Sequence, residues 1–193
     1  MKRAAVFLDR DGTINYDPGY LGDPEKFEFL PGVTEALKRL QHSGFFIFVV
    51  SNQSGIARGF FGEEDLKKIH DNMVLALLSR GVKLNGIYYC PHHPDDRCSC
   101  RKPSPKMVLD AAESYRIDLE SSYFIGDRAT DIETGRNAGC RTILVLTGEG
   151  EETLSQLAPG QQPDFVASDL GAAAQWILED EGEASKLNLD YRG

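Results

Sequence analysis

The chain has 193 residues, of which 41% are hydrophobic and 26% charged, and its formal net charge is -9. This length supplies enough apolar material for one core and is short for two full domains. The acidic balance argues against nonspecific nucleic-acid binding, in which a basic face supplies most of the affinity. No apolar run is long enough to cross a membrane, and the run that follows the basic start 1–3 is too short for a signal peptide. We therefore expect a cytoplasmic protein without nucleic-acid or membrane partners.

The predicted elements alternate between strand and helix, which is typical of an α/β fold with a parallel sheet and helices on both faces. Apolar runs predict strands at 4–9, 45–50, 86–90, 122–126, 141–146 and 164–167. Helical spacing of apolar residues predicts helices between Pro31 and Gly44, and over 66–77, 107–115, 130–138 and 172–178. We expect a single domain over 1–178, followed by an acidic, mobile tail over 179–193.

Two acids follow the first predicted strand. Asp9 and Asp11 stand where the apolar run 4–8 enters a turn that contains Gly12. Carboxylates at this spacing repel each other and resist burial unless a cation binds or one acid keeps its proton. Mg²⁺ is the expected cation, with Asp9 as a nucleophile and Asp11 as a proton shuttle that together form and hydrolyse an aspartyl-phosphate. For the pair alone, the alternative is a turn in which Asp caps a helix or bonds its own backbone.

Reactive polar groups also stand at the ends of other predicted elements. Ser51 and Asp127 follow two strands, and Lys102 precedes a helix. Because ligands bind at the carboxyl ends of parallel strands, we expect these side chains to converge on Asp9. Any one arginine or lysine of these segments has the alternative of a solvated surface charge. Together they indicate a phosphate pocket in an acidic chain, and they are Arg58, Arg101, Lys102 and Arg128.

Three cysteines and a histidine lie close together in the sequence. Cys90, Cys98 and Cys100 combine with His92 or His93 into a set of four ligands that is compatible with tetrahedral zinc. Four protein ligands leave no position for water, so this zinc would fix the loop 90–100 and take no part in chemistry. The alternatives are free thiols or a disulfide, and a reducing cytoplasm disfavours a disulfide.

Four segments carry a resemblance to a known family. DRDGT from Asp9, SNQSGIARG from Ser51, CRKP from Cys100 and GDRATD from Gly126 resemble the four motifs of the haloacid dehalogenase superfamily of phosphohydrolases. Within it, GIYYCPHHP from Gly86 resembles the branch that acts on heptose bisphosphate and histidinol phosphate. The resemblance implies Mg²⁺-dependent removal of the 7-phosphate of D-glycero-D-manno-heptose 1,7-bisphosphate, with histidinol phosphate as the alternative substrate.

The resemblance also implies roles for individual residues. Mg²⁺ would be held by the carboxylates of Asp9 and Asp127 and by the backbone carbonyl of Asp11. Ser51 and Lys102 would hold the transferring phosphoryl group. Of the two histidines, His92 would be the zinc ligand. Asp131 is either a metal-linked acid or a helix cap. The remaining substrate contacts would come from Asp17, Gly19, Tyr20, Asn52, Gln53, Ser54, Arg58, Arg101 and Arg128.

The segments between the motifs have room for little more than one helix and one strand each, so we expect no large cap domain. Selectivity would then come from the loops 15–22, 53–60 and 90–100, which suit a small phosphorylated sugar bound by a monomer. A receiver-like signalling domain is one non-enzymatic alternative, but it would place an acceptor aspartate where the third strand ends in Cys90. A silent phosphate-binding domain is the other, and it would need a defect in the site geometry.

Overall fold

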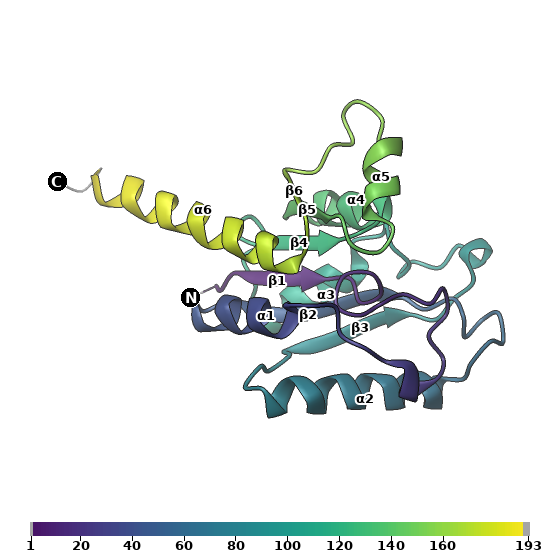
Figure 1. The fold of residues 1–193 in the computed structure, drawn as a ribbon. Coiled ribbons are helices and arrows are strands. Elements are labelled where there is room, and N and C mark those ends of the chain that lie inside the picture. Colours follow the sequence, from purple (N-terminus) through teal and green to yellow (C-terminus); the bar gives the residue numbers. More distant parts are fainter. Residues whose placement is uncertain (1, 191–193) are drawn as a thin grey trace.

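The centre of the structure is a six-stranded parallel sheet (Figure 1). The structure is a computed structural model that describes residues 2–190, and it leaves the side chains of 181–190 outside the description. The strand order is β3-β2-β1-β4-β5-β6, and all paired strands are parallel. The strands are β1 (Ala5–Leu8), β2 (Phe46–Asn52), β3 (Gly86–Cys90), β4 (Tyr123–Gly126), β5 (Arg141–Val145) and β6 (Phe165–Ala167). All six strands predicted from apolar runs are confirmed.

Helices cover both faces of the sheet, as the alternating pattern predicts. They are α1 (Val33–His42), α2 (Glu63–Ser79), α3 (Lys106–Tyr115), α4 (Ala129–Ala138), α5 (Gly150–Gln156) and α6 (Leu170–Asp190), with short 3-10 helices at Pro24–Lys26 and Pro94–Asp96. Because successive strand residues point to opposite faces, Val6 and Leu8 pack with α1, α2 and α6, whereas Ala5 and Phe7 pack with α3 and α4. Over the described residues no helix has the length and apolar character needed to cross a membrane.

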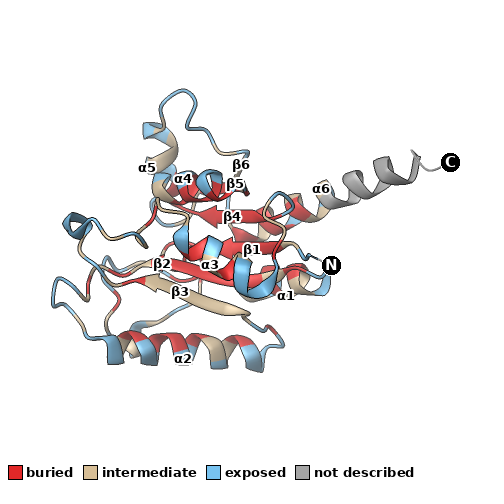
Figure 2. Cartoon of the chain, turned by 180° about the vertical axis from the view of Figure 1, so that it is seen from behind, coloured by how far each residue is buried: buried red, intermediate tan, exposed pale blue. Residues whose placement is uncertain are grey.

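The burial pattern follows this layering (Figure 2). Strands β1 and β4 are buried along their whole length, and β3 at the sheet edge is half-buried up to Cys90. Between β1 and β2 the described chain holds only α1 and one 3-10 helix, and between β2 and β3 it holds only α2. The expected fold without a large cap domain is therefore confirmed.

Two helices differ from the sequence prediction. Helix α6 runs to Asp190, whereas periodicity predicts an end at 178. Its first turns pack on the sheet, through residues such as Ala173 and Ile177, and good helix formers (Glu, Ala, Lys and Leu) follow in the sequence. Helix α5 is not predicted, because its seven residues include a single large apolar side chain. The mobility expected of 179–193 stays a prediction, and residues 191–193 lie outside the described residues.

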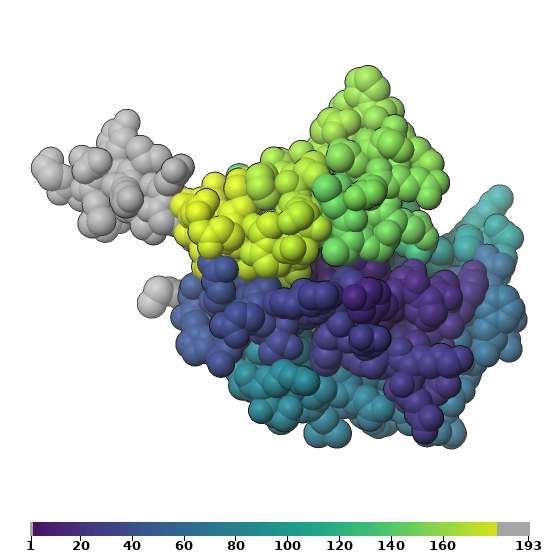
Figure 3. Space-filling view, in the orientation of Figure 1, coloured from purple at the N-terminus to yellow at the C-terminus, as the bar shows by residue number. Residues whose placement is uncertain are grey.

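The sheet order explains why distant segments meet at one edge. The chain leaves β1 toward β2 and β3 on one side and later builds β4, β5 and β6 on the other. Such a reversal between neighbouring strands opens a crevice at their carboxyl ends. Figure 3 shows the purple N-terminal segment adjoining the green segment that follows β5. There, the Thr147 hydroxyl donates to the Gly12 carbonyl at 2.6 Å.

Candidate active site

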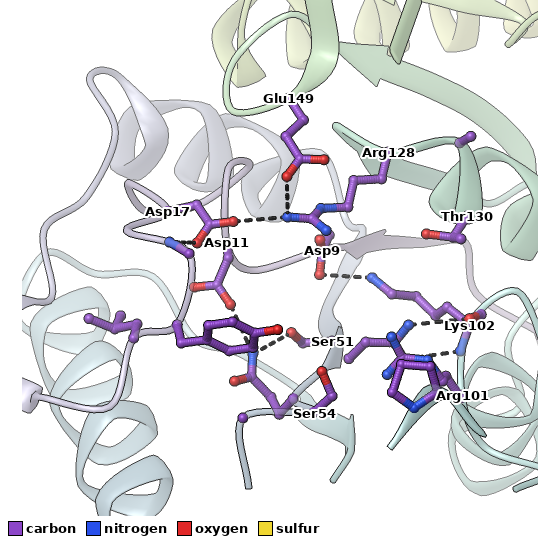
Figure 4. A pocket seen from close by; sticks show the side chains of 18 of the residues that line it. Asp9, Asp11, Asp17, Ser51, Ser54, Arg101, Lys102, Arg128, Thr130 and Glu149 are labelled. Carbon is purple, nitrogen blue, oxygen red and sulfur yellow. Dashed lines mark hydrogen bonds and ion pairs between the residues drawn. The ribbon is translucent and has the colours of Figure 1, made fainter. Parts of the chain in front are cut away.

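A pocket of about 460 Å³ opens at the carboxyl edge of the sheet (Figure 4). It is lined by every residue that the sequence predicts as catalytic or substrate-binding, namely Asp9, Asp11, Asp17, Gly19, Tyr20, Ser51, Asn52, Gln53, Ser54, Arg58, Arg101, Lys102 and Arg128. Asp127 and Asp131 are fully buried behind this lining. Parallel strands deliver these side chains to one edge because their ends lie in register: Leu8 pairs with Val49 on one side and with Ile125 on the other.

Three buried acids gather at the base of this pocket. Asp9 follows β1, Asp127 follows β4, and Asp131 lies in the first turn of α4; each offers a carboxylate oxygen within 4.8 Å of the other two. Asp127 Oδ2 accepts from the Glu149 amide at 2.8 Å, and its buried Oδ1 has no hydrogen-bond partner among the described residues. Burial, together with the charges of Asp9 and Asp131, raises the pKa of Asp127 to about 8. Hard oxygen donors with one orphaned atom suit a small divalent cation such as Mg²⁺.

Two glycines give the Asp127 carboxylate its space. A Cβ atom at Gly12 or Gly148 would lie 2.2 Å from Asp127 Oδ2. Both glycines also have positive φ, at +79° and +58°, where other residues are strained. The backbone therefore closes tightly around the carboxylate, and any side chain at either position would displace it.

Lys102 is the cation that compensates the acid cluster. Its Nζ lies 2.8 Å from Asp9 Oδ1 and 2.6 Å from Asp131 Oδ1, and it donates to the Val50 carbonyl at 2.9 Å. Only 3% of the residue is exposed. Burial opposes the charged form, but the two carboxylates outweigh it and raise the pKa of Lys102. The lysine is therefore held in its charged form. Figure 4 shows its side chain directed at Asp9.

Asn52 holds the backbone of Lys102 in place. Its Oδ1 accepts from the Lys102 amide at 3.0 Å, and its Nδ2 donates to the Lys102 carbonyl at 3.2 Å. Both polar atoms of this side chain are thus engaged within the protein. The side chain therefore serves the position of Lys102, and the substrate contact predicted for Asn52 stays a prediction.

Asp131 combines the two alternatives that the sequence leaves open. Its Oδ2 accepts from the Arg128 amide at 3.0 Å and so caps α4, while its Oδ1 pairs with Lys102. Burial raises the pKa of Asp131 to about 6, against the opposing charge of Lys102. One carboxylate therefore starts the helix and belongs to the acid cluster.

The Asp11 carboxylate lies apart from this cluster. Its oxygens accept from Arg10 Nη2 at 2.8 and 2.7 Å, from Asn15 Nδ2 at 2.9 Å and from Gln53 Nε2 at 2.9 Å. Gln53 Nε2 also donates to Ser51 Oγ at 2.8 Å. Burial by itself would raise the pKa of Asp11, but the Arg10 charge and these hydrogen bonds hold it below the ordinary value. A direct metal contact of Asp11 is therefore left to its backbone carbonyl, as the resemblance implies.

Sequence reasoning missed Arg10 and several residues of the pocket wall. Arg10 is fully buried and is among the largest fully buried side chains. The available signal was its position at the end of a buried strand, because a buried charge needs a partner. The missed polar wall residues are Thr130, Glu149, Thr153 and Gln156, three of which lie in or next to the unpredicted helix α5.

Arg128 and the ring of Tyr20 line the outer part of the pocket. Figure 4 shows Arg128 between two carboxylates, with Nη2 at 3.0 Å from Asp17 and 2.7 Å from Glu149. Tyr20 and Phe60 meet edge to face with ring centroids 4.7 Å apart, and both are substantially exposed. The outer pocket therefore offers charge and flat apolar surface together.

The cysteine cluster forms a compact set of four donors. Cys90 Sγ lies 3.2 Å from Cys100 Sγ and 3.5 Å from both Cys98 Sγ and His92 Nδ1. A tetrahedron with zinc–sulfur arms of about 2.3 Å has edges of roughly 3.8 Å, close to these separations. His93 instead accepts from the Asp95 amide and caps the 3-10 helix Pro94–Asp96. All four cysteines of the chain are free, so this set fits one metal ion and contains no disulfide.

Sequence comparison finds that this chain is similar to known phosphatases, as the geometry of the site indicates. Residues 99–173 match the HAD-hydrolase-like family model. A D-glycero-beta-D-manno-heptose-1,7-bisphosphate 7-phosphatase of Yersinia pestis is 40% identical over 190 residues, which are 94% of this chain and 93% of that protein. The corresponding enzyme of Escherichia coli K12 is 46% identical over 75% of this chain and 80% of its own length.

Solved structures give the same result. The D,D-heptose 1,7-bisphosphate phosphatase of B. bronchiseptica, solved with magnesium and phosphate, superposes with a TM-score of 0.85 at 39% identity, over 93% of this chain and 99% of that one. The corresponding enzyme of Burkholderia thailandensis gives a TM-score of 0.71 at 34% identity, over 91% and 99%. The chain therefore belongs to the heptose-1,7-bisphosphate 7-phosphatase family of HAD-like phosphohydrolases.

Proposed function

We propose that this chain hydrolyses the 7-phosphate of D-glycero-D-manno-heptose 1,7-bisphosphate in a Mg²⁺-dependent reaction. The observation that carries the proposal is the position of Asp9, which lies beside Lys102 and two further acids at the base of a pocket with three arginines in its wall. This arrangement supplies a nucleophile, a cation and a metal-binding face for one phosphoryl group. The names of the relatives supply the substrate.

The chemistry follows from the positions of the side chains. An Asp9 carboxylate oxygen attacks phosphorus, the bond from phosphorus to the sugar oxygen breaks, and Asp11 gives a proton to the leaving alkoxide. Because Arg10 favours the ionised form of Asp11, this step requires Asp11 to take up that proton before the alkoxide leaves. Water then attacks the phosphorus of the aspartyl-phosphate, Asp11 takes the water proton, and phosphate leaves with Asp9 regenerated. Ser51 and Lys102 hold the phosphoryl oxygens during both steps, where preorganised donors stabilise developing charge.

Magnesium fits the acid cluster described above. We propose that the carboxylates of Asp9 and Asp127 and the backbone carbonyl of Asp11 hold it. When bound, the ion neutralises charge on the phosphoryl oxygens and relieves the repulsion between the buried acids. The unpartnered Oδ1 of Asp127 supports this assignment.

The acid cluster predicts an unusual pH dependence of the metal-free protein. The folded-state pKa of Asp127, about 8, stands above its ordinary value of 3.8. The folded chain therefore holds a proton that the unfolded chain releases, so stability from this group is full at low pH and is lost as the pH rises through about 8. The folded-state pKa of Asp131 is raised to about 6, so Asp131 also makes the protein less stable as the pH rises, over a lower pH range.

We expect the Tm of metal-free protein to fall between about pH 5 and pH 8.5, and Mg²⁺ to raise Tm more at the higher pH. Asp127→Asn should flatten the fall, because the amide does not titrate. Thermal melts with and without Mg²⁺ measure both effects. A Mg²⁺ effect on Tm that is equal at both pH values would count against the proposed metal site.

We propose that Cys90, His92, Cys98 and Cys100 bind a structural zinc ion. The distances among the four donors and the separate capping role of His93 support this ligand set. Thiolate and imidazole ligands suit zinc, whereas the acids of the pocket suit Mg²⁺. The two ions should therefore be removable independently.

Cys98→Ser should release the zinc and loosen the loop 90–100, so that Tm falls while Asp9 and Lys102 keep their positions. Elemental analysis of protein purified without chelator should show one zinc per wild-type chain and less in the variant. Cys140→Ser is the matched control for zinc content, because Cys140 is buried and is not one of the four donors. If wild-type protein purified without chelator contains no zinc, the proposed zinc site is wrong.

Arg101 is a candidate contact for the second phosphate of the substrate. It lines the pocket, its Nη1 lies 3.5 Å from the His92 carbonyl, and among the described residues no carboxylate lies within ion-pair distance of it. Arg128, in contrast, is already paired with Asp17 and Glu149. A free guanidinium fork in a fixed loop suits bidentate binding of phosphate.

We expect Arg101→Ala to lower kcat/KM for heptose 1,7-bisphosphate about 10-fold or more, the loss of one charge-assisted contact. An aryl monophosphate lacks the second phosphate, so its kcat/KM should change much less. Arg97→Ala is the control, since Arg97 lies in the same loop and is exposed. Equal losses on both substrates would place Arg101 on the transferring phosphate instead.

A substrate panel tests the proposed function as a whole. Phosphate release with Mg²⁺ should be fastest with heptose 1,7-bisphosphate, offered as both anomers, and slower with histidinol phosphate and sugar monophosphates. Faster release from histidinol phosphate would show that the alternative substrate is the correct one. If the protein releases phosphate from none of these substrates, a phosphate-binding or receiver-like role is favoured over an enzyme.

We further propose that residues 1–178 act as one monomeric domain in the cytoplasm.

A further inference from the structure

Arg10 connects the site to a distant helix. Its guanidinium is fully buried and holds both oxygens of Asp11 through Nη2, with Nε at 3.0 Å from Oδ1. The remaining nitrogen, Nη1, lies 3.3 Å from Nε2 of His70. The mechanism above uses Asp11 but assigns no positioning role to Arg10 or His70.

His70 reaches this position from the middle of α2. It lies on the buried stripe of that helix with Leu66, Ile69 and Met73, and its ring meets the Tyr89 ring edge to face at 5.7 Å. A guanidinium can only donate, so Nε2 of His70 must accept, and the ring proton belongs on Nδ1. Burial and the neighbouring Arg10 lower the pKa of His70 to about 4, which keeps this acceptor available at neutral pH.

We propose that His70 is a positioning residue of the phosphatase reaction: its Nε2 accepts from Arg10 and thereby fixes the guanidinium that orients the Asp11 carboxylate. The inference rests on the proposed function, in which Asp11 transfers the proton. It adds a link from α2 to the reacting group across sixty residues of sequence. Without the acceptor, Arg10 Nη1 becomes a buried donor without a partner, and the guanidinium moves to satisfy it.

Substrates with different leaving groups distinguish this positioning role of His70 from a merely structural one. With a covalent intermediate, kcat/KM covers the steps up to departure of the alcohol. A sugar alkoxide needs the proton from Asp11 to depart, whereas an aryl oxide such as p-nitrophenolate departs without it. Misplaced Asp11 therefore lowers kcat/KM for sugar phosphates selectively, whereas a general loss of folding lowers it for both.

The test compares His70→Leu and His70→Gln with wild type on heptose 1,7-bisphosphate and on p-nitrophenyl phosphate. We expect His70→Leu to lose roughly 10-fold to 100-fold in kcat/KM on the sugar phosphate. This is only part of the 10²–10⁴-fold that acid-base catalysis supplies, because Asp11 is misplaced and not removed. The loss on the aryl phosphate should be small. His70→Gln should recover much of the activity, because its amide oxygen also accepts.

Met73→Ala is the matched control, since Met73 is buried one turn further along α2 and has no contact with Arg10 in the described interactions. It should lower Tm without changing the ratio of the two kcat/KM values. Equal losses on both substrates in His70→Leu, or no loss on either, would overturn the inference. If wild type rejects heptose bisphosphate, the proposed substrate fails, and any sugar phosphate that it does hydrolyse still gives the ratio.

Discussion

Asp9→Asn is expected to lower kcat for phosphate release by at least about 10⁴-fold, the scale of loss seen when a catalytic nucleophile is removed. The amide cannot attack phosphorus, so no aspartyl-phosphate forms. The fold should persist, because asparagine has the shape of aspartate and its Oδ1 still accepts from Lys102. The pKa of Asp127 should also fall, since the Asp9 charge is one of the causes that raise it.

The measurement is phosphate release under saturating substrate, paired with a thermal melt of the same sample. A melt close to that of wild type shows that the loss is chemical. Folded Asp9→Asn enzyme with kcat near that of wild type would show that Asp9 is not the nucleophile.

Lys102→Met is expected to affect both stability and turnover. The methionine leaves Asp9 and Asp131 buried without their cation, and removal of one partner from a buried ion pair costs about 3–5 kcal/mol of unfolding free energy. Loss of a donor to the transferring group should also lower kcat by about 10²–10³-fold. Both effects have one cause, the position of Nζ between two carboxylates.

The stability loss should depend on pH. In the wild-type chain the charge of Lys102 limits the rise in the pKa of Asp131 to about 6. In Lys102→Met this charge is absent, so the folded-state pKa of Asp131 should be higher. Proton uptake at lower pH then relieves the unpaired charge, so urea unfolding should show a smaller loss near pH 5.5 than near pH 7.5. Lys67→Met is the control, because its exposed pair with Asp71 is worth at most about 0.5 kcal/mol. Equal losses for both variants near pH 7.5 would contradict the account.

Much of the fold and of the site's composition is predictable from the sequence, for a geometric reason. Apolar runs predict all six strands, and parallel strands end at one edge. Residues that directly follow those runs, such as Asp9, Ser51 and Asp127, therefore meet without knowledge of any helix packing. The order of strands around β1 requires the structure, because apolar runs alone do not say which strands are neighbours.

What the sequence does not predict depends on tertiary packing. The contact between Arg10 and His70 arises only once α2 lies against the sheet, and nothing in the local pattern around either residue indicates it. Glu149 joins the pocket through the unpredicted helix α5. The isolation of Asp11 from the acid cluster is also a tertiary result, since Asn15 and Gln53 hold it from two different segments.

The most direct test of the central claim follows both phosphates of one substrate. Phosphorus NMR of heptose 1,7-bisphosphate incubated with the protein and Mg²⁺ resolves the phosphate on C1 from that on C7. The account predicts that the C7 signal is replaced by inorganic phosphate while the C1 signal persists, and that Asp9→Asn leaves both signals unchanged. Loss of the C1 signal first, or persistence of both signals with wild-type protein, would contradict it.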